Sequence, residues 1–162
     1  RAEEVGFRLQ DVITWYKPTA IAGMTDRNVV NKKEYVVCLS KSKDHALRSE
    51  QSHDASENGP EDPAIAANHR LGNLWRHPVK RGTVGQDVIH KAPYPTSLTD
   101  RIISLSTDRG DTVLDPFLGS GTTALSALDL GRHCIGYEIN DDFAAVVAER
   151  LSSLQQRALT EF

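Results

Sequence analysis

Short apolar runs and stretches with helical spacing follow one another most clearly in the second half of the chain. Residues 112–114 form an apolar run that predicts a strand, and residues 122–130 have the spacing of a helix. A turn containing glycines lies between them at 119–121. A second apolar run at 133–137 predicts the next strand, and Glu138 follows it. Strand, glycine turn, helix, strand and acid in this order are typical of a nucleotide-type cofactor site in an open α/β sheet.

The pattern before this region predicts further elements. Residues 1–10 indicate the end of a helix, while residues 11–16 and 34–39 are rich in β-formers and predict two strands that pair as neighbours. A helix is expected after residue 95, with Thr96 or Ser97 as its cap. Its apolar stripe consists of Leu98, Ile102, Ile103 and Leu105.

The pattern after Glu138 predicts a final helix. Asn140 and Asp141 are expected to cap it. Its buried face is expected to carry Phe143, Val146, Val147, Leu151 and Leu154. The residues from 155 to 162 are expected to fray.

The bulk properties are those of a globular protein with the length of one domain. The chain has 162 residues and a formal net charge of −3, so any contact with DNA must come from a local basic patch. No apolar run reaches the length of a membrane span. Cys38 and Cys134 both lie in apolar runs, which indicates buried thiols in a reducing, cytoplasmic compartment rather than a disulfide or a metal pair.

The turn between the strand and the helix has the chemistry of a cofactor site. Gly119 and Gly121 lack Cβ atoms, so the backbone can turn sharply and come close to a ligand. The helix that follows directs unpaired N–H groups at that ligand, and Glu138 stands where an acid takes ribose hydroxyls in such folds. Asp115 would repel a pyrophosphate, but it suits a cationic group such as the ammonium of S-adenosylmethionine (SAM). An ordinary strand–turn–helix with two turn glycines is the alternative interpretation.

The middle of the chain changes character twice. Residues 44–68 are dominated by small polar residues, acids, Gly and Pro, which predict a long exposed loop. Residues 69–81 bring basic residues together with Trp75, and two interpretations are open. Either the Arg and Lys side chains contact DNA phosphates, or the segment is a solvated strand edge with Trp75 as a core anchor. His69 and His77 have no acid or Cys at a metal-ligand spacing, so no metal site is expected.

Several motifs together carry a resemblance to a known family. They are Trp15-Tyr16-Lys17-Pro18, Arg27 with Asn31 and Glu34-Tyr35, His90 to Pro95 with Leu98, Asp115 to Thr123, and Gly136 to Asn140. With these motifs the chain resembles the C-terminal half of the bacterial DNA amino-methyltransferases. Enzymes of that family transfer a methyl group from SAM to the exocyclic amino group of cytosine or adenine. The match is closest to the group whose catalytic motif precedes the SAM motif. The resemblance implies a Rossmann-like SAM-dependent methyltransferase fold of the α/β class, double-stranded DNA as the substrate and a role in restriction–modification.

The resemblance also implies roles for individual residues. The expected cofactor-binding residues are His90, Ala92, Tyr94, Asp115, Pro116, Phe117, Gly119, Ser120, Gly121, Thr122, Thr123, Glu138 and Asn140. The expected DNA contacts are Lys17, Arg27, Trp75, Arg76, Lys80 and Arg81. The chain would divide into an edge hairpin at 1–43, an insert or target-recognition region at 44–89, and a SAM-binding strand–helix–strand–helix unit at 90–162.

One motif of the family is missing from the sequence. Members of the family act through (Asp/Ser/Asn)-Pro-Pro-(Tyr/Trp/Phe), whose first residue accepts a hydrogen bond from the target amino group while the aromatic ring stacks on the flipped base. No two prolines are adjacent here, and the imitation at Ala92-Pro93-Tyr94 has no polar first residue. The catalytic residues therefore stay unknown. We expect an incomplete fold whose catalytic strands belong to a longer protein or a partner chain, and no activity from this chain alone.

Two other functions fit parts of the sequence. The glycine turn is compatible with a module that binds NAD or a flavin, and the basic segment is compatible with a catalytically silent DNA-binding subunit. The residue types in the segment from His90 to Pro95 favour cytosine over adenine as the target base. The recognition sequence cannot be read from these residues.

Overall fold

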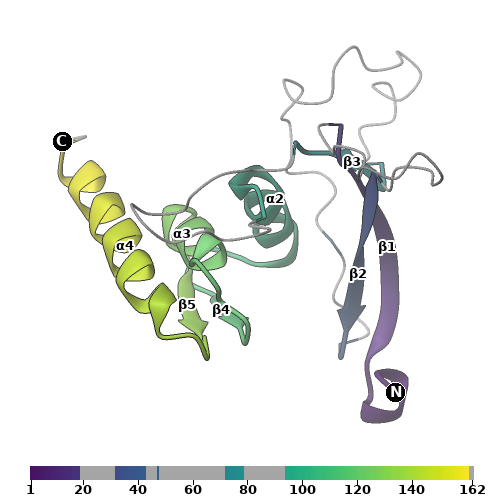
Figure 1. The fold of residues 1–162 in the computed structure, drawn as a ribbon. Helices are drawn as coiled ribbons and strands as arrows, with labels where there is room; N and C mark the ends of the chain where they lie inside the picture. Colours follow the sequence, from purple (N-terminus) through teal and green to yellow (C-terminus); the bar gives the residue numbers. More distant parts are fainter. Residues whose placement is uncertain (19–31, 43–46, 48–71, 79–93, 161–162) are drawn as a thin grey trace. The chain divides into compact units, whose positions relative to one another are not determined.

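The computed structural model describes residues 1–18, 32–42, 47, 72–78 and 94–160. It divides into two compact units, Arg1–Val79 and Lys80–Phe162, which are taken separately below (Figure 1). Within the described part, no helix is long and apolar enough to cross a membrane, and no cluster of three or more His, Cys, Asp or Glu residues is placed to hold a metal ion.

The first unit is built on a three-stranded sheet with the order β2-β1-β3. The strands are β1 (Arg8–Tyr16), β2 (Lys33–Ser40) and β3 (Leu74–Arg76). β1 and β2 pair antiparallel, as expected from the sequence, and β3 pairs with β1 in parallel through Trp15 and Trp75. β3 comes from the segment that was expected to belong to the insert, so this sheet draws on more of the chain than the predicted hairpin.

The start of the chain corrects one prediction. Residues 1–10 form a helix end only as far as Gly6: a short 3-10 helix, η1 (Glu3–Val5), is closed by Gly6 at a φ of 89°, and β1 already begins at Arg8. The apolar residues Val5, Phe7 and Leu9 alternate with other residues, which is the period of a strand rather than of a helix.

One face of this sheet is packed and the other is open. Ile13, Trp15 and Trp75 are buried, and the indole N–H groups of the two tryptophans donate to the carbonyl oxygens of His77 (2.8 Å) and Gly72 (2.9 Å). The large apolar side chains on the other face of the β1–β2 ladder, where Val12 pairs with Val37, are exposed in this structure. They are Val12, Tyr35, Val37 and Leu39.

The second unit has the order helix, strand, helix, strand, helix that the hydrophobic pattern predicts. Its elements are α2 (Thr96–Ser106), β4 (Thr112–Asp115), α3 (Thr122–Asp129), β5 (His133–Gly136) and α4 (Asp142–Thr160). β4 and β5 pair in parallel with Asp115 opposite Gly136, so the chain leaves both strands at the same edge of the sheet. α3 packs against α2, α4 and both strands (Figure 1).

The core of this unit lies between the helices and one face of the two strands. Leu98, Ile103 and Leu105 of α2 are buried, as are Ala124 and Ala127 of α3. A short hydrogen bond of 2.6 Å between the hydroxyls of Thr99 and Ser126 ties α2 to α3 inside this core. On the other face, the register partners Leu114 and Ile135 remain 62% and 50% exposed.

Two helix ends differ from the sequence predictions. Pro95 is the N-cap of α2, and neither Thr96 nor Ser97 caps it, because α2 already begins at Thr96. α4 extends to Thr160, whereas the sequence predicts that the helix loses its order from residue 155. Its start follows the prediction, since the side-chain oxygen of Asn140 accepts from the N–H of Asp142 at 3.0 Å.

Candidate cofactor site

The carboxyl end of β4 continues into a tight turn built around Asp115 and two glycines. The carboxylate of Asp115 accepts from the N–H of Phe117 at 2.9 Å, which holds the start of the turn. Gly119 and Gly121 have φ angles of 54° and 82°, in the left-handed region where a side chain is costly. The N–H of Gly121 donates to the carbonyl of Leu118 at 3.0 Å and closes the turn just before α3 begins.

The carboxyl end of β5 lies beside this turn and is bonded to it. The carboxylate of Glu138 accepts from the N–H of Gly119 at 2.8 Å with one oxygen and from the N–H of Asn140 at 2.8 Å with the other. The N–H of Leu118 donates to the carbonyl of Tyr137 at 2.8 Å. Asp115, the glycine turn and Glu138 therefore share one edge of the sheet, which is the arrangement that the sequence predicts.

Large apolar side chains lie close to these acids in the sequence and are open to solvent. Phe117 is 86% exposed and Ile139 is 99% exposed, and Tyr137 is also exposed. Tyr137 and Ile139 were not among the predicted cofactor-binding residues, although both lie in the segment from Gly136 to Asn140 that resembles the family. Ile139 carries a signal that would have found it, because a lone apolar residue between Glu138 and Asn140 lies in a strand-to-helix turn and outside any periodic pattern.

Some residues expected to bind the cofactor turn their side chains inward. Ser120 is 3% exposed, Thr122 is also buried, and Thr123 is half-buried. These positions therefore offer a ligand mainly the backbone at the start of α3, where the first N–H groups of a helix have no intrahelical acceptor. Pro116 and Asn140 are exposed at the same edge.

The remaining predicted residues are spread over the chain. Tyr94 is exposed just before α2. Lys17 forms an ion pair with the carboxylate of Glu34 at 2.5 Å, and Arg76 is exposed on β3. Trp75 is buried in the first unit, which favours the core-anchor interpretation over a contact with DNA. His90, Ala92, Arg27, Lys80 and Arg81 lie outside the described residues.

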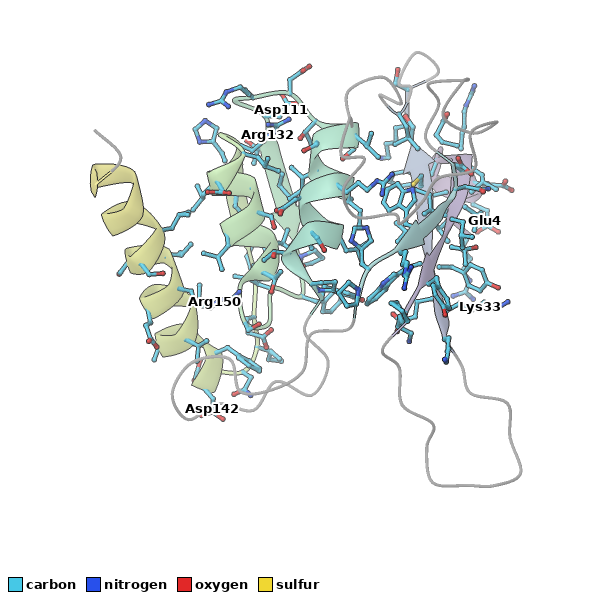
Figure 2. All side chains as sticks on the ribbon, turned by 90° about the horizontal axis from the view of Figure 1, so that it is seen from above. Glu4, Lys33, Asp111, Arg132, Asp142 and Arg150 are labelled. Atoms are coloured by element: carbon cyan, nitrogen blue, oxygen red, sulfur yellow. The ribbon has the colours of Figure 1, made fainter. Side chains whose placement is uncertain are left out.

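A separate open pocket of about 230 Å³ lies among α2, α3 and α4. Its lining includes Asp100, Asp129 and Arg150, but none of the residues predicted to hold the cofactor. Burial raises the pKa of Asp100, the Ser126 hydroxyl opposes this rise and the Asp129 carboxylate adds to it. Figure 2 shows the side chains of this unit, with Arg150 projecting from α4.

Comparison with known proteins assigns the chain to a family. The profile of the N6-N4 DNA methylases matches residues 1–149. The type II methyltransferase M.MjaI of Methanocaldococcus jannaschii is 28% identical over 99% of this chain and 54% of its own length. The type II methyltransferase M1.MboII of Moraxella bovis is 32% identical over 85% of this chain and 60% of its own length.

Solved structures show the same fold. The crystal structure of the M1.HpyAVI–SAM complex matches 93% of this chain and 65% of that chain, with 27% identity and a TM-score of 0.68. The PvuII DNA methyltransferase, described as cytosine-N4-specific, matches 92% of this chain with a TM-score of 0.70; at 23% identity this likeness shows the α/β methyltransferase fold alone.

The comparisons also measure how much of a methyltransferase this chain represents. It spans about half the length of the curated relatives it matches, 54% of M.MjaI and 60% of M1.MboII. Solved relatives include complexes with SAM, which confirms the cofactor expected from the sequence for this family. With a matching profile over residues 1–149 and the family's fold, the chain belongs to the N6-N4 DNA methylases.

Proposed function

We propose that this chain is the SAM-binding and target-recognition portion of a DNA amino-methyltransferase, which methylates the exocyclic amino group of cytosine or, as the alternative, of adenine. The observation that carries the proposal is the pair of acids, Asp115 and Glu138, at the carboxyl ends of neighbouring parallel strands, with the glycine turn bonded between them. Ligands of open α/β sheets bind at this edge.

The residues at this edge fit SAM better than a dinucleotide. The carboxylate of Asp115 disfavours a pyrophosphate by charge repulsion, whereas the ammonium of SAM gains from an acid. The carboxylate of Glu138 can accept from the ribose hydroxyls of either cofactor. We assign Asp115 to the ammonium and Glu138 to the ribose. The exposed side chains of Phe117 and Ile139 offer apolar surface to the adenine ring. When bound, SAM supplies the methyl group on a sulfonium.

Calorimetry on the complete enzyme, this chain together with the portion that carries the catalytic motif, separates SAM from the alternative cofactors. The proposal predicts heat of binding for SAM and none for NAD or FAD at the same concentrations. Binding of NAD without SAM would replace this proposal with the dinucleotide-module alternative. Gel shifts that show DNA binding without any binding of SAM would instead support the silent-subunit alternative.

For the DNA contacts we propose the basic residues Lys17, Arg27, Arg76, Lys80 and Arg81, with Trp75 holding β3 in place. Arg76 has the firmest support among the described residues because its side chain stands exposed on β3 beside the buried Trp75. Arg76→Ala should weaken binding to all DNA sequences alike and reduce the slope of affinity against salt concentration by about one unit. An unchanged slope would remove Arg76 from the interface.

We also propose that the complete enzyme supplies the catalytic motif on strands that pair with this chain. In the described part β4 has one paired neighbour, β5, and the face carrying Leu114 and Ile135 is open. The sheet of the first unit likewise exposes Val12 and Val37. Sheets with parallel strands are normally covered on both faces. The remaining length of the curated relatives is consistent with such a missing portion.

A further inference from the structure

The guanidinium of Arg150 on α4 contacts the glycine turn from its buried side. Nη1 of Arg150 donates to the backbone carbonyl oxygen of Ser120, and it also lies 3.2 Å from the Ser120 hydroxyl oxygen. Ser120 is 3% exposed, so this contact is on the protein side of the turn and not on the side open to solvent. Burial lowers the pKa of Arg150, but an arginine in a protein remains protonated at neutral pH.

The same face of α4 closes the turn sterically. Val147 precedes Arg150 by one helical turn, which places the two side chains next to each other on the helix surface. A Cβ atom added to Gly121 would lie 3.1 Å from a methyl carbon of Val147. α4 therefore presents an apolar wall and a cation to two consecutive residues of the turn.

These contacts fix the orientation of one peptide group. The peptide between Ser120 and Gly121 is held by its N–H, which donates to Leu118, and by its carbonyl, which accepts from Arg150. Glycine at a φ of 82° allows such a peptide to rotate at little cost, because it has no side chain to oppose the change. Rotation would turn the Ser120 carbonyl away from Arg150 and break the hydrogen bond from the N–H of Gly121 to Leu118.

We infer that Arg150 is a positioning residue for the cofactor turn: it selects one orientation of the Ser120–Gly121 peptide and so prepares the start of α3 for SAM. It does this without touching the cofactor itself. The inference rests on the proposed function, since it assigns a role toward the ligand of that same site. A turn that is already ordered binds more tightly because less ordering free energy is spent on binding.

The test compares three variants of this chain, each within the complete enzyme proposed above, by calorimetry with SAM and by thermal unfolding. Arg150→Met keeps the aliphatic stem and removes the donors, and SAM binding should weaken about 10-fold or more, as for loss of a charged hydrogen bond. Arg150→Lys restores a charged donor without the planar fork and should recover part of the affinity. KM for SAM should rise in Arg150→Met while KM for DNA stays unchanged.

Arg132→Met is the matched control. Arg132 is also a part-buried arginine that donates to backbone carbonyls, those of Leu130 (2.5 Å) and Thr107 (2.8 Å), but it lies at the amino ends of β4 and β5. Figure 2 labels it beside Asp111, away from Arg150 and Asp142. Arg132→Met should lower the melting temperature and leave the affinity for SAM unchanged at temperatures where the protein is folded.

The inference is overturned if the wild-type protein binds SAM and Arg150→Met binds it equally well. It is also overturned if Arg132→Met loses as much affinity as Arg150→Met, because the loss then reflects stability alone. If the wild-type protein binds no SAM, the proposed function fails together with this inference. If Arg150→Met does not fold, the folded Arg150→Lys protein provides the test. The inference is contradicted if neither the KM nor the dissociation constant for SAM rises in Arg150→Lys.

Discussion

Glu138 connects the two strand ends through its carboxylate. One oxygen accepts from Gly119 and the other from Asn140, so the side chain orders both the glycine turn and the loop that leads into α4. In the proposed complex this carboxylate also accepts from the ribose hydroxyls. A single residue would therefore contribute to the fold of the site and to the affinity for its ligand.

The first prediction follows from this double role. Glu138→Ala leaves the N–H groups of Gly119 and Asn140 without this acceptor, so we expect a loss of about 1–2 kcal/mol in the free energy of unfolding together with a loss of SAM binding. Urea unfolding and calorimetry measure the two effects. Glu149→Ala, at an exposed position on α4, is the control and should change neither. Wild-type SAM affinity in Glu138→Ala would exclude this residue from the site.

Gly121 and Gly110 form a natural pair for a second prediction. Both have positive φ angles, 82° and 87°, so an alanine at either position should cost about 1–2 kcal/mol of stability. A Cβ at Gly110 would meet nothing within 4 Å, whereas one at Gly121 would press on Val147. Gly121→Ala should therefore destabilise the protein more than Gly110→Ala, and it alone should weaken SAM binding. If urea unfolding shows the same loss of stability for both variants, Val147 of α4 does not constrain the turn.

At the scale of the elements, the packing of α2 on α3 brings Asp100 into a partly desolvated position beside Asp129 and Ser126. Because the pKa of Asp100 is raised in the folded protein, the folded state retains this proton to a higher pH than the unfolded chain does. Stability from this group therefore falls as the pH rises from about 4, the ordinary Asp value, through the folded pKa. Above that range the ionised carboxylate disfavours the fold.

The third prediction is that Asp100→Asn raises the melting temperature at pH 7. The gain should disappear as the pH is lowered through the same range, because Asp100 then becomes neutral in the wild-type protein. Thermal unfolding at a series of pH values measures it. Glu149→Gln removes a carboxylate at an exposed position and is the control, which should not raise the melting temperature at pH 7. A melting temperature of Asp100→Asn below that of the wild type at pH 7 would contradict the sign of the effect.

The elements also show what local sequence can and cannot predict. β4, α3 and β5 were predictable because each has its own apolar period and is bounded by glycine or an acid, and the juxtaposition of Asp115 with Glu138 follows from parallel strands sharing an edge. The pairing of β3 with β1 and the contact of Arg150 with Ser120 are long-range, and no local spacing encodes them. The strand start at Arg8 was missed because Gly6 and the acids before it form a short 3-10 helix, and the prediction extended that helix to residue 10.

At the scale of the whole molecule, the two units share one property. Each has a packed face and an open apolar face. In the first unit Ile13 and Trp15 are buried on one face, while Val12 and Val37 are exposed on the other. In the second unit Leu114 and Ile135 are exposed. Exposed apolar surface on this scale indicates an interaction site. This chain covers only 54% of M.MjaI and 60% of M1.MboII. We therefore propose that the rest of the methyltransferase fold covers these open apolar faces.

The fourth prediction concerns this occupant. The 162-residue chain alone should transfer no methyl groups to DNA, and turnover should appear when it is combined with the portion that carries the Pro-Pro motif. Replacing Leu114 or Ile135 by Asp should prevent this recovery, since a charge on the proposed interface would be desolvated. Robust turnover by the isolated chain would show that it presents the target base without help.

Methyl transfer by the complete enzyme tests the central claim most directly. The complete enzyme is this chain together with the portion that carries the Pro-Pro motif. Unmethylated DNA is incubated with the protein and SAM, digested to nucleosides and analysed by mass spectrometry, with Glu138→Ala in parallel. The account predicts N4-methylcytosine, or N6-methyladenine as the alternative, and none with Glu138→Ala. Methylation at carbon 5 of cytosine, or no methylated base from a folded wild-type protein, would contradict it.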